Sequence, residues 1–117
     1  MKKIILIAVS LIATSVAHAE SVFVKYRGSV PLDSFQCEDI TRSSVIKRVC
    51  YDKANSYLVL NLNGTYYHYC EVGVSVVSEL LNASSMGKYY GTYIKGQGEM
   101  GPFDCRVRKV PEYGSNK

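Results

Sequence analysis

Four cysteines are the residues in this sequence whose type and spacing point most directly to chemistry. They are Cys37, Cys50, Cys70 and Cys105. A zinc site could use such a set, but no two of them have the Cys-x-x-Cys spacing of a zinc knuckle. An even number of widely spaced cysteines in an exported chain is typical of disulfides. The sequence therefore predicts two disulfides, and neither a metal site nor a cofactor.

The first 19 residues have the pattern of an export signal. Lys2 and Lys3 precede an apolar run, and Ala17-His18-Ala19 supplies the small residues of a cleavage site before Glu20. The run is shorter than the ~20 apolar residues that span a bilayer, and no cysteine follows the cleavage site to carry a lipid. We expect a Sec-type signal peptide over residues 1–19, cleaved between Ala19 and Glu20. A single periplasmic or secreted domain over residues 20–117, with no membrane span, would remain.

Length and composition fit one folded domain. The 117 residues suit a single core, and 47% hydrophobic with 21% charged residues excludes a disordered chain. The formal charge of +4 falls once Lys2 and Lys3 leave with the signal, because 12 basic residues then face 10 acidic ones. So small an excess gives little support to nucleic-acid binding, which rests on clustered positive charge.

Alternating apolar side chains predict an antiparallel β-meander in the middle of the chain. Strands are expected over residues 43–52, 56–62 and 65–72, and Asn63-Gly64 is typical of a tight hairpin turn. A further strand over residues 21–27 and an irregular segment over residues 28–42 would precede the meander.

The hydrophobic period then changes to that of a helix. Val77, Leu80 and Leu81 predict an amphipathic helix with Ser75 as its N-cap, and a second short helix is expected from residue 85 to Gly96. The fold class is therefore α+β: a small antiparallel meander with one or two short helices on one face, held by two disulfides.

Strand register limits the disulfide pairing. Pairing about the two turns places Cys50 and Cys70 both opposite Tyr57, on one face of the sheet with the middle strand between them. Two strand spacings are about 9.6 Å, whereas disulfide Cβ atoms lie about 3.5–4.5 Å apart. A Cys50–Cys70 bond is therefore disfavoured. Cys37–Cys50 with Cys70–Cys105 is preferred, and Cys37–Cys70 with Cys50–Cys105 stays open.

The two faces of the predicted sheet differ in character. The face away from the cysteines is apolar and aromatic and is expected to receive the helices; it carries Val45, Val49, Tyr51, Leu58, Leu60, Leu62, Tyr67 and Tyr69. The cysteine face is half-polar and is expected to be partly covered by the flanking segments; it carries Tyr57, Val59, Asn61, Tyr66 and His68.

The order of residues along the meander and helices resembles the KTSC domain, a small module that also occurs at the C-terminus of some lysyl-tRNA synthetases. The resemblance covers residues 43–96, and the matching positions are Ser43, Ser44, Tyr51, Gly64, Tyr67, Tyr69, Val72, Ala83, Ser85, Gly87 and Ile94. It implies a structural role for these residues, and it offers no activity to carry over to this chain. Gly73 stands where the family often has proline. The four cysteines and both flanks look like an exported variant.

Binding is the function that these residues favour. The sequence has no evident nucleophile–base pair or phosphate-binding loop, which predicts a protein that is not an enzyme. An aromatic and basic surface for a protein or glycan of the cell envelope is expected from Tyr57, Tyr66, His68, Lys88, Tyr89, Tyr90, Tyr93 and Lys95. Core packing is the alternative role for part of this set. A nucleic-acid-binding module is the alternative function, but the basic residues are dispersed and an exported chain does not meet tRNA.

Overall fold

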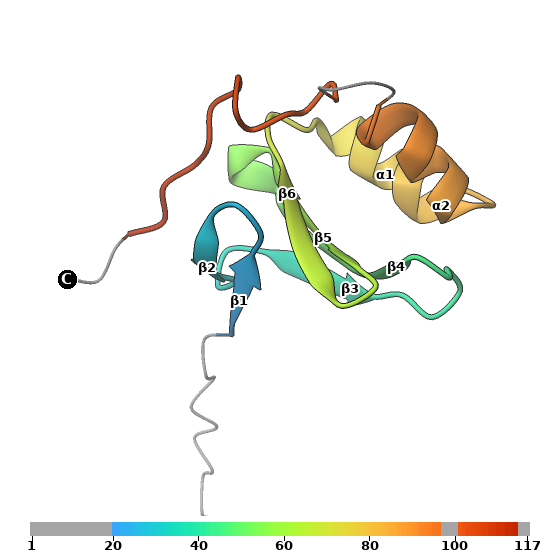
Figure 1. Ribbon diagram of the computed structural model, residues 1–117, viewed down its shortest axis with the longest axis horizontal. Helices are drawn as coiled ribbons and strands as arrows, with labels where there is room; N and C mark the ends of the chain where they lie inside the picture. Colours follow the sequence, from blue (N-terminus) through green and yellow to red (C-terminus); the bar gives the residue numbers. More distant parts are fainter. Residues whose placement is uncertain (1–19, 97–100, 115–117) are drawn as a thin grey trace, which may run out of the picture.

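The computed structural model describes residues 20–96 and 101–114, which form a six-stranded mixed sheet with two short helices (Figure 1). The predicted signal peptide and its cleavage residue Ala19 lie outside the described residues. The strands are β1 (Ser21–Val24), β2 (Gly28–Pro31), β3 (Gln36–Asp39), β4 (Ile46–Asp52), β5 (Tyr57–Leu62) and β6 (Thr65–Tyr69). Their order in the sheet is β2-β1-β6-β5-β4-β3, and only β1 and β6 pair in parallel. The α+β prediction is confirmed.

One short helical turn connects two strands, and the other helical elements follow the last strand. A 3₁₀ turn, η1 (Lys53–Asn55), joins β4 to β5, and α1 (Val74–Asn82), α2 (Met86–Tyr89) and a π-helical turn, η2 (Tyr90–Ile94), follow β6. Within the described residues, no helix is long and apolar enough to cross a membrane.

Strands β4, β5 and β6 form the predicted meander. Asn63 and Gly64 have φ values of 53° and 102°, the left-handed conformations that a type I′ turn requires. Val45 was predicted to lie on the apolar face of the sheet. This was wrong, because a bulge between Ile46 and Arg48 shifts the register. Ser43 Oγ accepts hydrogen bonds from the N–H groups of Val45 and Ile46 at this bulge. Ile46 is consequently the residue buried in the hydrophobic core between the sheet and the helices, which we call the helix-side core.

Residues 28–42 are not irregular as predicted, since they contain β2 and β3. A tight turn with positive φ at Tyr26 and Gly28 folds β2 back onto β1. The polar edge strand β3 has no alternating apolar pattern, and all four of its residues are exposed. Its pairing with β4 is fixed by the Cys37–Cys50 disulfide, which explains why sequence periodicity missed it.

The helices pack on one face of the sheet, as predicted (Figure 1). Val77, Leu80 and Ile94 meet Leu58 and Leu60 of β5 in this helix-side core. Helix α1 begins earlier than expected: its N-cap is Gly73, whose C=O accepts hydrogen bonds from Val76 and Val77. The prediction of Ser75 as the N-cap was therefore wrong.

Both disulfides have the preferred pairing, Cys37–Cys50 and Cys70–Cys105. Cys37 lies directly opposite Cys50 across β3 and β4, with a Cα–Cα distance of 4.0 Å. The predicted register of Cys50 was wrong by two residues, since it lies opposite Val59 rather than Tyr57. A shift of two keeps the side chain on the same face, so the argument against a Cys50–Cys70 bond still holds.

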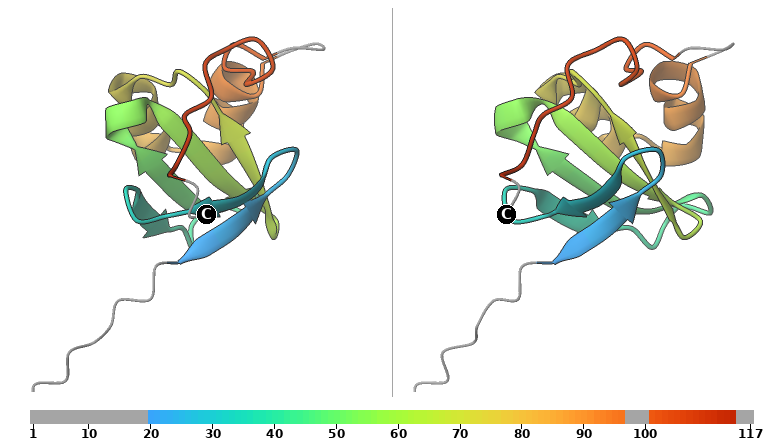
Figure 2. Two further views of the ribbon diagram at one scale, coloured as in Figure 1. Left: turned by 90° about the vertical axis from the view of Figure 1, so that its left-hand side faces the viewer. Right: turned by 60° about the vertical axis from the view of Figure 1, so that its left-hand side comes forward.

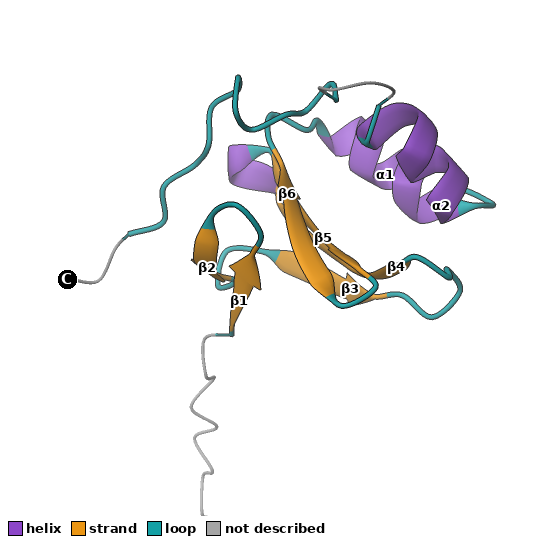
Figure 3. Cartoon of the chain, viewed as in Figure 1, coloured by secondary structure: helices purple, strands orange, loops and turns teal. Residues whose placement is uncertain are grey.

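The flanking segments cover the cysteine face, as predicted, but they bury more of it than expected and form a second hydrophobic core there. Tyr57 and Val59 are 0% exposed there. Val24 and Val30 of the β1–β2 hairpin cover one part of this face, and Val110 and Tyr113 cover another. We call residues 101–114 the C-terminal segment; Figure 2 shows it crossing this side of the sheet, and Figure 3 shows it as loop.

Candidate binding groove

A groove of about 910 Å³ runs along the edge of β6, between the helix layer and the C-terminal segment. Four segments line it: the β1–β2 turn, β6, the end of η2 and the C-terminal segment. Their lining residues are Tyr26 and Arg27; Tyr67, His68 and Tyr69; Tyr90, Ile94 and Lys95; and Gly101, Phe103, Asp104, Cys105, Arg106 and Val110.

Among the described residues, the strand edge at the base of the groove is hydrogen-bonded to its neighbours at its two ends only. Lys25 N–H donates to the C=O of Tyr66 at 2.8 Å, and Cys70 N–H donates to the C=O of Phe103 at 2.9 Å. Backbone groups of alternate strand residues face the same edge, so the N–H and C=O of His68 also face it. The parallel pairing with β1 stops at Tyr66, and no other described strand joins β6 here.

The His68 side chain turns inward, toward the cysteine face. Its Nδ1 lies 2.8 Å from the Tyr57 hydroxyl, and the two rings meet edge-to-face with centroids 5.8 Å apart. Burial lowers the pKa of His68, and the positive charge of Arg27 lowers it further. The imidazole is therefore neutral at neutral pH, and it acts as a packed, hydrogen-bonded side chain.

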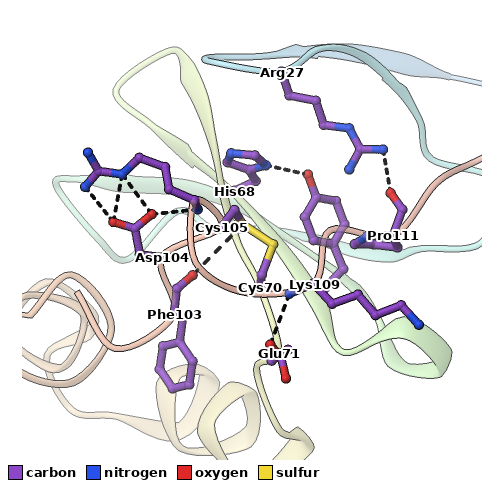
Figure 4. Close-up of a disulfide and its surroundings, with 11 residues drawn as sticks. Arg27, His68, Cys70, Glu71, Phe103, Asp104, Cys105, Lys109 and Pro111 are labelled. Carbon is purple, nitrogen blue, oxygen red and sulfur yellow. Dashed lines mark hydrogen bonds and ion pairs between the residues drawn. A yellow bond between two sulfur atoms is a disulfide. The ribbon is translucent and has the colours of Figure 1, made fainter. Parts of the chain in front are cut away.

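Arg27 holds a positive charge at the β1–β2 end of the groove. Its guanidinium lies over the rings of Tyr57 and Tyr113, at 5.2 and 5.4 Å from their centroids. Nη2 donates a 2.6 Å hydrogen bond to the C=O of Pro111 (Figure 4). Nη1 is buried and has no hydrogen-bond partner within the described part of the chain.

Positive charge exceeds negative charge along the described groove lining. Arg106 and Asp104 form an ion pair with a shortest N–O distance of 2.6 Å, which lowers the pKa of Asp104 to about 2. These two charges offset each other, and the charges of Arg27 and Lys95 remain. An acidic ligand is therefore favoured over a basic one.

The helix-side wall of the groove is aromatic. The hydroxyl groups of Tyr69 and Tyr90 lie 2.5 Å apart, and their rings meet edge-to-face at 5.9 Å. Burial raises the pKa of both hydroxyls. At the outer rim, Lys25 Nζ lies over the rings of Tyr26 and Tyr67. Tyrosine rings thus line the groove beside the open strand edge.

The residues predicted to share one binding surface lie in three places. His68, Tyr90 and Lys95 line the groove. Lys88, Tyr89 and Tyr93 belong to α2 and η2 outside it. The two tyrosine rings pack at a tilt with centroids 4.8 Å apart, and Tyr89 Oη donates to Glu79 Oε2 at 2.7 Å. Tyr57 and Tyr66 lie on the cysteine face.

The prediction of a single exposed surface was therefore wrong. It was wrong for Tyr57, which is fully buried because Phe35 and Tyr113 pack against its ring. Tyr90 packs into the helix-side core as well, with only a small part of it exposed where it lines the groove.

Sequence reasoning missed the groove residues contributed by the two flanks. Tyr26 and Arg27 belong to a turn that was predicted to be strand, and Phe103 and Asp104 follow a segment without periodicity. One signal was available: the preferred Cys70–Cys105 disulfide places residues 103–106 beside the end of β6. Figure 4 shows His68 next to this disulfide, with Asp104 close by.

The KTSC-like residues make contacts that hold the fold together. Tyr51 Oη donates to the C=O of Val72 at 2.6 Å, and Ser85 Oγ caps α2 by accepting from the N–H of Lys88. Arg42 donates to the carbonyls of Leu81 and Ala83 at the end of α1. Other matched positions lie exposed or partly exposed at turns and helix starts, namely Ser44, Gly64 and Gly87.

One group of possible metal ligands lies at the same end of β6. The ligand atoms of His68, Cys70 and Cys105 lie within 4.8 Å of one another. Both sulfur atoms belong to the disulfide, however, so neither is a thiolate that could bind a metal.

The fold and the groove define a small disulfide-bonded α+β domain in which two flanking segments extend a central meander-and-helix unit. Residues 42–97, which contain this unit, match the family model of the KTSC domain. The structure is similar to the crystal structure of a KTSC domain protein from Yersinia pestis, with a TM-score of 0.50 and 26% identity over 54% of this chain and 89% of that chain. No curated protein matches the sequence.

Some of the groove residues lie within the region that matches the KTSC domain, and others lie in the two flanks. Strand β6, Tyr90 and Lys95 lie within residues 42–97, whereas Arg27 and Phe103 lie outside them. The two disulfides join each flank to this domain and indicate an oxidising, extracytoplasmic compartment.

Proposed function

We propose that this chain is an exported binding module that receives a protein or glycan partner of the cell envelope in the groove along β6. The observation that carries the proposal is the combination, in one groove, of an open strand edge, aromatic walls and an excess of positive charge. Grooves lined by apolar side chains with a few placed polar groups are the usual sites of ligand binding. The module acts by binding, without turnover of its partner.

Two observations support the proposal that the protein is exported. The disulfides suit an oxidising compartment. Glu20, the predicted first residue of the mature chain, is held by Arg48 through two hydrogen bonds of 2.6 and 2.9 Å. The mature chain would therefore begin at a residue that is already fixed to β4.

Nucleic-acid binding has less support than binding of an envelope partner. Arg42 caps α1, Arg48 pairs with Glu20, and Arg106 pairs with Asp104. These arginines serve contacts within the protein, which reduces the charge offered to a phosphate backbone. Retention of the oxidised protein on single-stranded DNA or RNA that weakens with salt would favour this alternative.

A pull-down with matched variants tests the proposed site. The bait is the disulfide-intact mature protein, and the groove variant is Tyr26→Ala with Lys95→Glu. Tyr26 is 83% exposed, so its truncation leaves the core intact. The control, Tyr93→Ala with Lys53→Glu, alters the same residue types outside the groove. We expect the wild type and the control to retain the same envelope component and the groove variant to lose it. Equal retention by the groove variant, or no retained component, would contradict the proposal.

A further inference from the structure

We infer that the groove takes an extended acidic peptide, which adds as a short strand to the open edge of β6. The inference rests on the proposed binding function and names the class of partner. Three observations carry it: the backbone groups at the edge, the length of the edge, and the charge around it.

The backbone of β6 offers a hydrogen-bonding position that no described strand uses. Tyr66 and Cys70 are bonded to neighbouring segments through the groups that face this edge. His68 lies midway between them with the same backbone orientation, and the pairing of β1 with β6 has ended before it. An added strand would donate to the C=O of His68 and accept from its N–H, as in the recognition of peptides by strand addition.

The open edge has the length of a short peptide. Four residue steps separate Tyr66 from Cys70, which is about 13 Å at the rise of a β-strand. Three or four residues of an extended ligand fit this span. At one end the β1–β2 turn limits the groove, and at the other end Phe103 does, through its bond to Cys70.

The positive charge at the groove favours acidic side chains in the ligand. The Lys95 side chain is exposed at the groove, and Arg27 lies at the β1–β2 end, whereas the single described carboxylate of the lining, Asp104, is paired with Arg106. An acidic peptide gains from both Lys95 and Arg27. Its alternate apolar side chains would face the rings of Tyr69 and Tyr90, because successive residues of a strand point to opposite sides.

A glycan fits the same groove less well. Sugar recognition needs side-chain donors and acceptors directed at hydroxyl groups. Here the His68 ring is bonded to Tyr57, and the carboxylate of Asp104 is bonded to Arg106. The N–H and C=O of His68 remain available to a ligand, and a peptide backbone is the natural complement of a strand edge.

Peptides of defined backbone test the inference. The probe is the acetylated, amidated tetrapeptide Glu-Val-Glu-Val, titrated into the ¹⁵N-labelled, disulfide-intact mature protein. Two derivatives are N-methylated at the odd or at the even positions, and a fourth peptide has lysine in place of glutamate. Only alternate N–H groups of an added strand face its partner. We therefore expect one N-methylated peptide to bind at least about tenfold more weakly than the other.

Charge reversal gives the matched control. Lys95→Glu should weaken binding of the acidic peptide by about fivefold or more, whereas Lys53→Glu should leave it unchanged. The lysine peptide should bind more weakly than the acidic one. Equal binding of both N-methylated peptides, or no shift of the His68 amide at millimolar acidic peptide, would overturn the inference. If chitotetraose instead shifts the groove amides, the inference fails and the proposed binding function stands.

Discussion

Tyr113 donates a 2.6 Å hydrogen bond to Oδ2 of Asp52, which lies 61 residues earlier in the chain. Asp52 is 1% exposed and also accepts hydrogen bonds from Ser34 Oγ and from the backbone and side-chain N–H groups of Asn55. One buried carboxylate thus joins the segment before β3, the η1 turn and the C-terminal segment. This contact closes the second core and holds the C-terminal wall of the groove in place.

Removing the Tyr113 hydroxyl should destabilise the protein. Tyr113→Phe keeps the ring over Phe35 and Tyr57 but deprives the buried carboxylate of one donor. We expect a loss of about 1.5–3 kcal/mol in the free energy of unfolding, the range for hydrogen bonds to charged groups. Urea denaturation measures it. Tyr26→Phe, at an exposed tyrosine, should change the stability little, and equal effects of the two variants would contradict this role.

Acid should weaken the same contact. Burial alone would raise the pKa of Asp52, but the hydrogen bonds from Asn55, Tyr113 and Ser34 outweigh it and hold the pKa below the ordinary 3.8. A carboxylate with a lowered folded-state pKa stabilises the fold fully above its unfolded pKa, and this stability is lost as pH falls through the folded value.

The stability difference between wild type and Asp52→Asn isolates this effect. We expect it to be constant from pH 7 to about pH 5 and to shrink below about pH 4. Urea denaturation at each pH gives the difference. A difference that grows as the pH falls would show that the carboxylate is not held ionised by its donors.

The two disulfides should contribute unequally to stability. Chain entropy predicts about 3 kcal/mol for the 13-residue separation of Cys37–Cys50 and about 4 kcal/mol for the 35-residue separation of Cys70–Cys105. Paired serine variants of each bond, compared by thermal and urea unfolding, measure the two values. The Cys70–Cys105 variant should in addition lose peptide binding, because Phe103 and Cys105 line the groove. Retained binding at full affinity would contradict a groove wall held by this bond.

Gly101 should be the least replaceable glycine of the described chain. A Cβ there would collide with the carbonyl oxygen of Lys95, which is backbone and cannot turn away. Gly101→Ala is expected to cost about 1–3 kcal/mol, the range for overpacked sites. Gly87→Ala is the control, since a Cβ there meets nothing within 4 Å and alanine favours the helix. Loss of stability in the control alone would contradict this assignment.

The exported protein should begin at Glu20. Cleavage between Ala19 and Glu20 leaves the Glu20 carboxylate free to bind Arg48, which lowers the pKa of Glu20. Intact-mass measurement of the protein from the periplasm or medium should show loss of residues 1–19 and of four hydrogens for two disulfides. A mass that retains the first 19 residues would contradict export through this signal.

The meander and helices could be predicted from the sequence because their signals are local. Asn63-Gly64 fixes one turn, and the spacing of Val77, Leu80 and Leu81 marks the amphipathic face of α1. Face parity also survives a register error of two residues, which is why a Cys50–Cys70 bond could be argued against although the strand partner of Cys50 was predicted wrongly. The choice between the two remaining disulfide pairings was a preference, and the structure has the preferred one.

The flanks and the groove could not be predicted in the same way, because they depend on contacts between residues that are distant in the sequence. Strand β3 is polar and is defined by its disulfide, and the turn that carries Arg27 has no Asn-Gly signal. Burial of Tyr57 requires Phe35 and Tyr113, which come from opposite ends of the chain. A pattern read along one segment therefore places Tyr57 on the correct face without showing that the face is covered.

Amide hydrogen exchange at His68 tests the central claim of an open strand edge most directly. In the free, disulfide-intact protein, the His68 amide should exchange much faster than those of Tyr67 and Tyr69, which pair with Leu60 and Leu58 of β5. The acidic peptide should then slow it. A His68 amide as protected as its two neighbours in the free protein would show that the edge is closed and would contradict the account of the groove.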